Sequence, residues 1–399
     1  MKENDISKNE KAKEQIYQVR RLIQDPFLNF ILDRNINPII VWALTSCIFL
    51  LIYLVMALKF GYFESKGNYI GFVEDYGVFI NFTVGTPAII VFHIQLSKYL
   101  DNCFNYLLVN GVFKKPTEAA IKRFSTKDNV YSLEVFFEEQ MKNSITKNRW
   151  AFFSFIVSAI FIITTYHLRL DAKTWVSANI SSFIVSEIIW FILFGVTALF
   201  GFRILNTIWW INESFKRFNI NVRPLFPDGA GGLQPLSRFS IQLGYMLSVF
   251  GVELVLNQIQ TGYIRTGNLG VITWEFDTIF VWIIYFVLAP ILFFAPIGAA
   301  HDAMLEAKNR ELLNFSKQFE KDYDDLRNNL NLGAKEVEGR IKKITELRKL
   351  YDMVKTFPVW PFQLQKFAQF SATIASPLLL AILTDVVTRF IATLFSSNP

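Results

Sequence analysis

Long apolar bands alternate with polar, charged segments along the chain after residue 37. Each band holds about as many apolar residues as a helix needs to cross a bilayer, roughly 20. The seven bands are residues 38–58, 76–96, 150–167, 182–211, 239–259, 277–300 and 370–394. This pattern predicts an all-α fold: a polytopic transmembrane helix bundle of about seven spans with a cytoplasmic helical hairpin.

Prolines and excess length mark the bands that depart from a plain straight helix. Pro87 lies inside the second band and removes one helix hydrogen bond, so we expect a kink there. Pro290 and Pro296 are kink points in the sixth band, and Pro377 lies within the seventh. The fourth band is about ten residues longer than one crossing requires, so it either tilts or projects into the cytoplasm.

The distribution of positive charge predicts the orientation. Of the 40 Lys and Arg residues, 33 lie in segments 1–37, 98–149, 212–238 and 301–368. Cytoplasmic loops carry the excess of Lys and Arg in membrane proteins. We therefore expect a multi-pass membrane protein with a cytoplasmic N-terminus and, after seven spans, an external C-terminus. The same topology places Trp175 in the outer aromatic belt.

The first segment, residues 1–37, is charged and then amphipathic. Apolar residues recur there at helical spacing, and such a helix either lies in the membrane interface, docks on the cytoplasmic mouth of the bundle or packs on the protein's own soluble part. Because it is tethered at one end and lies on the cytoplasmic side, it is a candidate plug. The gate candidates are Ile16, Val19, Leu22, Ile23 and Phe27.

Two further cytoplasmic segments are large enough to fold. Residues 98–149 are predicted to be helical, with one apolar stripe. Residues 301–356 have the pattern of a helical hairpin, in which apolar residues recur every seven positions as in a coiled coil and Leu332-Gly333 marks the turn. The charged outer face of this hairpin is either simply solvated or a docking site for a cytosolic partner or a neighbouring subunit. Residues 357–399 then return the chain to the membrane as the seventh helix.

Composition and candidate chemistry argue against an enzyme. The chain is 52% hydrophobic and 16% aromatic, and it has no cleavable signal peptide, so the first membrane helix is expected to do the targeting. The three histidines have no metal-ligand spacing, and no nucleophile elbow occurs. Cys47 lies in an apolar band and Cys103 in a polar segment, which argues against a disulfide. We therefore expect no enzymatic activity, no metal and no cofactor.

Polar residues inside the bands are candidates to line a pore, because such groups are costly in a bilayer. With so few of them in one subunit, conduction is expected at the axis of a homo-oligomer. The competing interpretations are helix packing through small residues, snorkelling of carboxylates to the outer interface, and snorkelling of Arg203 to the inner one. Asp385 and Arg389, four apart, are expected to pair. The pore-lining candidates are Asn81, Thr83, Thr86, Glu187, Thr197, Asn206 and Glu253.

A glycine-rich loop at residues 224–235 separates the fourth and fifth bands. Successive glycines allow backbone N–H groups to point into one concavity, which is how proteins build anion-binding nests. The alternative is a rigid turn, in which Asp228 caps the following helix or accepts bonds from the loop itself. The ligand-binding candidates in this loop are Asp228, Gly229, Gly231 and Gly232.

The Pro-Asp-Gly-Ala-Gly-Gly-Leu run at 227–233 and the Val-Trp-Pro-Phe run at 359–362 resemble a set of uncharacterised bacterial multi-pass membrane proteins. The layout is also similar to membrane effectors of bacterial anti-phage systems, including the DNA-regulated channel of the Hailong type. This resemblance implies an oligomeric ion channel that stays shut until infection and then depolarises the host. A nucleic-acid-gated version requires a basic cytoplasmic surface. Positive-inside topology is the simpler explanation of its candidates, which are Lys114, Lys115, Lys122, Arg123, Lys127, Lys142, Lys147 and Arg149.

Three functions remain open at the level of sequence. The first is a homo-oligomeric inner-membrane channel or pore in contact with the lipid bilayer, regulated by a cytosolic protein, nucleotide or nucleic acid. The second is a non-conducting scaffold or signal receiver whose hairpin binds a cytosolic partner. The third is a transporter or membrane enzyme that uses Asp228, His301 and Asp302 near the inner interface.

Overall fold

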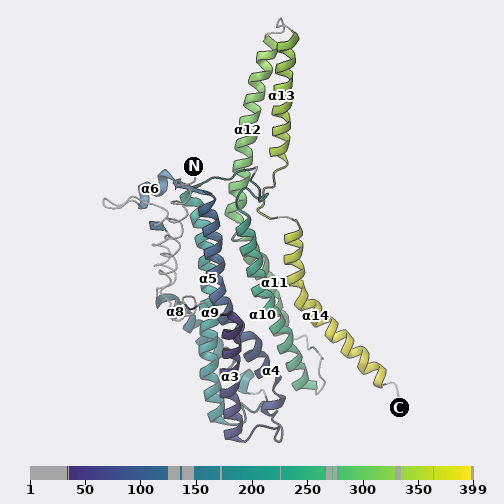
Figure 1. Cartoon of the computed structure of the whole chain (residues 1–399). Coiled ribbons are helices and arrows are strands. Elements are labelled where there is room, and N and C mark those ends of the chain that lie inside the picture. Colours follow the sequence, from purple (N-terminus) through teal and green to yellow (C-terminus); the bar gives the residue numbers. More distant parts are fainter. Residues whose placement is uncertain are drawn as a thin grey trace.

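The protein is a bundle of long helices from which a helical hairpin projects at one end (Figure 1). Its structure is a computed structural model. The residues that it describes are 34, 36–124, 135–136, 148–170, 173–224, 226–266, 272, 276–328, 334–362 and 364–396. Nearly all of the elements are helices, so the predicted all-α fold is confirmed.

In the part of the chain that the structure describes, six helical stretches are long and apolar enough to cross a membrane, which makes this a multi-pass membrane protein. They coincide with six of the seven predicted bands, and the third band is helix α8 (Asn148–Leu170), with a shorter apolar stretch at Trp150–Thr164. The helices of the six stretches are α3 (Pro38–Phe60), α4 (Tyr76–Ile80) with α5 (Thr86–Val109), α9 (Ile180–Arg217), α10 (Gln234–Thr266), α11 (Phe276–Phe294) with α12 (Gly298–Asn328), and α14 (Leu364–Ser396).

The end of the bundle opposite the hairpin is closed by the segment between α3 and α4, which includes the short helix η1 (Phe72–Glu74). Trp175 packs edge-on against Tyr53 and Phe72, and its backbone N–H donates to the carbonyl of Ile70 at 2.8 Å. Its side chain is fully buried. The predicted place of Trp175 in an aromatic belt is therefore wrong, because these neighbours enclose its ring.

At the hairpin end, strand β1 (Phe113–Pro116) pairs antiparallel with β2 (Phe218–Ile220), next to helix α6 (Glu118–Phe124). The helical prediction for residues 98–149 missed β1. Phe113 and Phe218 lie edge to face, 6.2 Å apart, and both are buried, whereas the lysines of β1 are exposed. Pro116 ends β1 where an edge strand tolerates a residue without an N–H group.

The hairpin consists of α12 and α13 (Ala334–Lys355), and the predicted turn at Leu332-Gly333 lies outside the described residues. An ion pair between Lys343 Nζ and Asp322 Oδ1, 2.8 Å apart, joins its two arms. At its base, the His301 ring stacks on Trp360, and His301 Nδ1 lies 2.7 Å from the Val359 carbonyl oxygen. These contacts fix the place where the chain returns to the membrane.

Candidate functional site: a polar seam inside the bundle

The second membrane span contains a π-helical segment, η2 (Asn81–Gly85), between α4 and α5. The hydrogen bond from the Thr86 N–H to the carbonyl of Asn81, five residues earlier, is characteristic of the wider π-helical turn. Pro87 has no N–H, so the carbonyl of Thr83 loses its helical donor, and the indole Nε1 of Trp42 on α3 fills the gap at 2.8 Å. The break that Pro87 predicts therefore takes the form of a π segment, a feature frequent at functional sites.

A polar seam joins this π segment to helix α10. Asn81 Nδ2 donates to the Gly77 carbonyl at 2.8 Å and to Asn257 Oδ1 at 3.2 Å. Asn257 Nδ2 in turn donates to the backbone carbonyl of Glu253 at 3.0 Å. Because Glu253, Asn257 and Gln260 follow each other at spacings of four and three, they share one face of α10.

The carboxylate of Glu253 lies against the backbone of Gly85, at the end of the π segment. Its oxygens and Cδ occupy the place where a Cβ at residue 85 would stand, so the close approach depends on glycine. The half-buried Glu253 side chain accepts no hydrogen bond from the described part of the chain. A carboxylate set between helices in this way is the kind of group that marks ion or proton pathways in membrane proteins.

Gln260 and Asp75 continue the seam toward the end of the bundle away from the hairpin. Gln260 is 5% exposed, and neither atom of its amide group has a partner among the described residues. Asp75 precedes the span and caps α4, where its Oδ1 accepts from the Val78 N–H at 3.3 Å. Burial raises the pKa of Asp75 to about 6. The seam thus contains polar groups that its own hydrogen bonds leave only partly satisfied.

The structure separates the seven pore-lining candidates. Asn81 and Glu253 meet in the seam, and Thr83 belongs to the same π segment, although its hydroxyl bonds back to the Phe79 carbonyl at 2.6 Å. Thr86 is buried directly after that segment. The three candidates on α9 form no described contact with the polar seam. Thr197 Oγ1 donates to the Leu193 carbonyl at 2.8 Å, and Glu187 and Asn206 are half-buried.

Two further intramembrane predictions have different outcomes. The Asp385–Arg389 ion pair is confirmed, with 2.9 Å between Oδ2 and Nε. The interpretation that Arg203 snorkels to the interface is wrong. Its Nη1 lies 2.6 Å from His93 Nε2 and its Nη2 donates to Ser97 Oγ at 2.5 Å, so the guanidinium joins α9 to α5.

The glycine-rich loop is organised around the carboxylate of Asp228. Its Oδ1 accepts from the Ala230 and Gly232 N–H groups at 2.9 and 3.0 Å, and its Oδ2 accepts from Gln234 N, the first residue of α10, at 3.3 Å. Gly229, Gly231 and Gly232 all have positive φ. The structure thus shows the arrangement in which Asp228 closes the loop and caps α10, and these two loop amides donate to a carboxylate of the chain itself.

The remaining candidates do not form a common centre. Gate candidates 16–27 lie outside the described residues, as does the side chain of Arg123 in α6, whereas Lys114 and Lys115 are exposed on β1. Asp228 and Asp302 line different cavities. In the described part of the chain, no three His, Cys, Asp or Glu residues are placed to hold a metal ion.

The sequence identified Asn81 and Glu253 but missed their partners Asn257, Gln260 and Gly85. The spacing of Glu253, Asn257 and Gln260 was a usable signal, because it places three polar side chains on one helix face. The role of Gly85 depends on a helix more than 160 residues away and has no local signal.

Comparison with protein-family models, with curated proteins and with solved structures finds no match.

Proposed function

We propose that the protein is an ion channel of the bacterial inner membrane, formed by a homo-oligomer and regulated from the cytoplasmic side. One observation carries the proposal: the Glu253 carboxylate, set against the π segment at Gly85 and beside the Asn81–Asn257 bond. Keeping such groups between membrane helices costs stability, and in membrane proteins they mark functional sites, ion pathways among them. Carboxylates and amides of this kind select cations in channels.

The surface of the bundle supports assembly in the membrane. Large apolar side chains on α3 and α14 are strongly exposed, among them Ile39 at 74% and Phe390 at 64%. Such faces suit lipid or a neighbouring subunit. The hairpin arm α12 begins four residues after α11 ends, so a partner held by the hairpin acts directly on a membrane helix. The positive-inside distribution of Lys and Arg supports a cytoplasmic position for that hairpin.

Planar-bilayer recording of the purified protein tests this function. We expect the wild type to carry cation-selective current, and Glu253→Gln to lower the cation-to-anion permeability ratio several-fold because one carboxylate is lost. Glu346→Gln, on the exposed surface of the hairpin, is the matched control and leaves the ratio unchanged. A wild type without current would contradict the proposal and favour the scaffold, for which the hairpin exposes Leu313, Ile341 and Met353 to a partner.

A role in anti-phage defence is the finer part of the proposal and rests on the resemblance of the 227–233 and 359–362 runs. Under this role the channel opens on infection and dissipates the membrane potential of the host. Depolarisation after phage infection in cells that express the protein, and its absence in cells that express Glu253→Gln at the same level, is the expected result. Equal potentials in both strains would remove the defence role and leave the channel activity to be judged from the bilayer recordings.

A further inference from the structure

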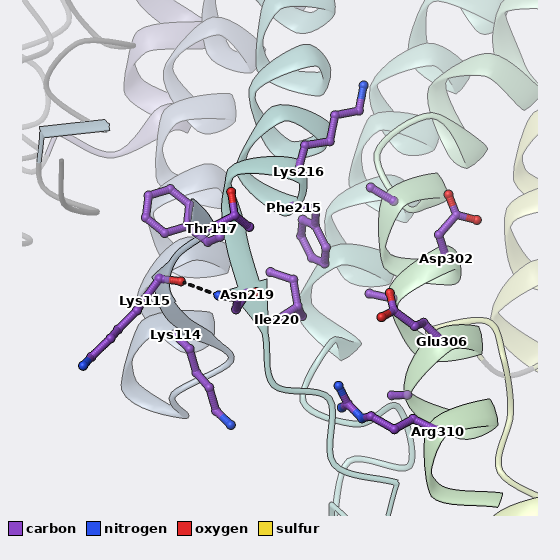
Figure 2. Close-up of a pocket in the computed structure, with 14 residues that line it drawn as sticks. Lys114, Lys115, Thr117, Phe215, Lys216, Asn219, Ile220, Asp302, Glu306 and Arg310 are labelled. Carbon is purple, nitrogen blue, oxygen red and sulfur yellow. Dashed lines mark hydrogen bonds between the residues drawn. The ribbon is translucent and has the colours of Figure 1, made fainter. Parts of the chain in front are cut away.

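A cavity of about 940 Å³ lies at the hairpin end of the bundle, between the β1–β2 pair, the end of α9 and the base of α12 (Figure 2). Its apolar floor contains Phe215 and Ile220. Cationic and acidic side chains surround this floor. The charged residues that line the cavity are Lys114, Lys115, Lys216, Arg310, Asp302 and Glu306.

The charged residues of this cavity differ from those of a second cavity. Its four cations, contributed by β1, α9 and α12, have no side-chain partner among the described residues, and neither do its two carboxylates. The second cavity, of about 550 Å³ beside the glycine-rich loop, is different: Arg238 there donates to Gln234 Oε1 and Lys366 to Gln369 Oε1. The larger cavity therefore holds unused donors and acceptors together.

The charged side chains point in two directions (Figure 2). Arg310 and Glu306 extend from α12 toward β2, on the side where Lys114 lies, whereas Lys115 and Lys216 reach outward. The lining residues of α12 run from Ala299 to Arg310, about 16 Å along the helix at 1.5 Å per residue. An elongated ligand fits this span better than a single phosphate does.

We propose that this cavity binds a small phosphorylated anion that also carries hydroxyl or amino groups. Arg310 and Lys114 supply the charge-assisted bonds that phosphate oxygens accept. Asp302 and Glu306 accept from hydroxyl or amino donors, and they repel an anion that has none. Phe215 offers an apolar face to a base or a glycerol backbone. Two sources share this chemistry, a soluble nucleoside phosphate and an anionic phospholipid headgroup.

The ligand is also placed to act as the cytoplasmic signal, and this part rests on the proposed channel function. It bridges β1, which follows α5, and the base of α12, which follows α11. Both preceding helices belong to membrane spans. Occupancy therefore fixes the position of the hairpin relative to the second and sixth spans.

Isothermal titration of the purified full-length protein with ATP and with inorganic triphosphate tests the soluble source. We expect Arg310→Gln and Lys114→Gln each to weaken ATP binding about ten-fold, the effect of one charged hydrogen bond. Lys342→Gln, an exposed change on α13, is the matched control. The double variant Asp302→Asn/Glu306→Gln is expected to bind triphosphate more tightly and to discriminate less in favour of ATP.

The lipid source is tested by reconstitution in phosphatidylcholine nanodiscs with and without phosphatidylglycerol, followed by native mass spectrometry of the retained lipid. If the wild type retains phosphatidylglycerol and Arg310→Gln does not, the cavity is a headgroup site. If the wild type binds ATP but retains no phosphatidylglycerol, the ligand is soluble. Arg310 and Lys114 are both exposed, so we expect size-exclusion chromatography to show that the Arg310→Gln and Lys114→Gln variants are folded. If neither probe binds the wild type, or if both Gln variants bind as the wild type does, the inference is overturned. These readouts need no current, so they fail or succeed independently of the channel function.

Discussion

Helix α10 meets its neighbours through two faces that are built in different ways. Toward α14 and α11, a Cβ at Gly251 would lie 2.7 Å from Pro377 Cγ on α14 and 2.7 Å from the Tyr285 hydroxyl on α11. Toward the second span, the Glu253 carboxylate lies where a Cβ at Gly85 would stand. Both contacts need a glycine, but the first brings ring atoms together and the second makes room for a charged group.

This difference separates stability from function within one helix. In a bilayer, apolar helices gain little by leaving lipid for each other, so close packing through small residues holds them together. The α10–α14 face is of this kind. The opposite face keeps a carboxylate between helices, together with the amide of Gln260, which has no partner among the described residues. Such groups lower stability and are retained where function requires them. We therefore expect substitutions on the two faces to differ in what they damage.

The largest effect is expected from Gly251→Leu. The new side chain meets a proline ring and a buried tyrosine hydroxyl, neither of which moves easily, so overpacking should cost about 3 kcal/mol. Thermal unfolding in detergent, followed by tryptophan fluorescence, measures this loss. Gly201→Leu on α9 is the matched control, because a Cβ there has no neighbour within 4 Å. Equal unfolding temperatures for the two variants would show that α14 is not held by the glycine face.

The bands could be predicted from the sequence, whereas of the two faces of α10 only the polar one has a signal, the spacing of Glu253, Asn257 and Gln260. Hydropathy over a window of one span is a local property, and it located the six spans and α8. Which side of an apolar helix faces protein is not a local property, because lipid and neighbouring helices are equally apolar and only a polar stripe marks an inward side. Trp175 and Arg203 illustrate the limit, because both turn inward onto partners from distant segments.

Pro87 shows the same limit for backbone geometry. Proline predicts that the helix ladder is interrupted, and the interruption is present. Its form, a π segment whose free carbonyl at Thr83 is bonded by Trp42, depends on a side chain from another helix, 41 residues away. Asn81 and Glu253 were recognisable because polar residues in apolar bands stand out, while Gly85 was one glycine among many.

The second prediction concerns Asp75, at the end of the polar face. Because burial raises its pKa from 3.8 to about 6, the folded protein binds the proton more tightly than the unfolded chain does. The stabilisation is complete below pH 3.8, the pKa in the unfolded chain, and is lost as the pH rises through about 6, the pKa in the folded protein. Between pH 4.5 and 7.5 the wild type should lose about 2 kcal/mol from this group, at 1.36 kcal/mol per pKa unit.

Asp75→Asn should remove this dependence, since an amide oxygen still accepts from the Val78 N–H and carries no charge at any pH. Unfolding temperatures measured across the same pH range compare the two proteins. Asp352→Asn, an exposed change on α13, corrects for general effects of removing a carboxylate. A wild type and an Asp75→Asn variant with parallel pH profiles would mean that Asp75 is not buried as described.

The smallest effect on stability, and the sharpest separation of the two faces, is expected from Gly85→Ala. The added methyl displaces only the end of a flexible Glu253 side chain, and alanine favours the helix by about 1 kcal/mol over glycine. The net change in unfolding free energy should therefore be near zero. When Glu253→Ala is added to Gly85→Ala, the full stabilisation by alanine at residue 85 should appear. Because the displaced carboxylate leaves its place at the π segment, Gly85→Ala should shift ion selectivity in the direction of Glu253→Gln. A variant that instead loses stability as Gly251→Leu does, with selectivity intact, would show that both faces of α10 serve packing alone.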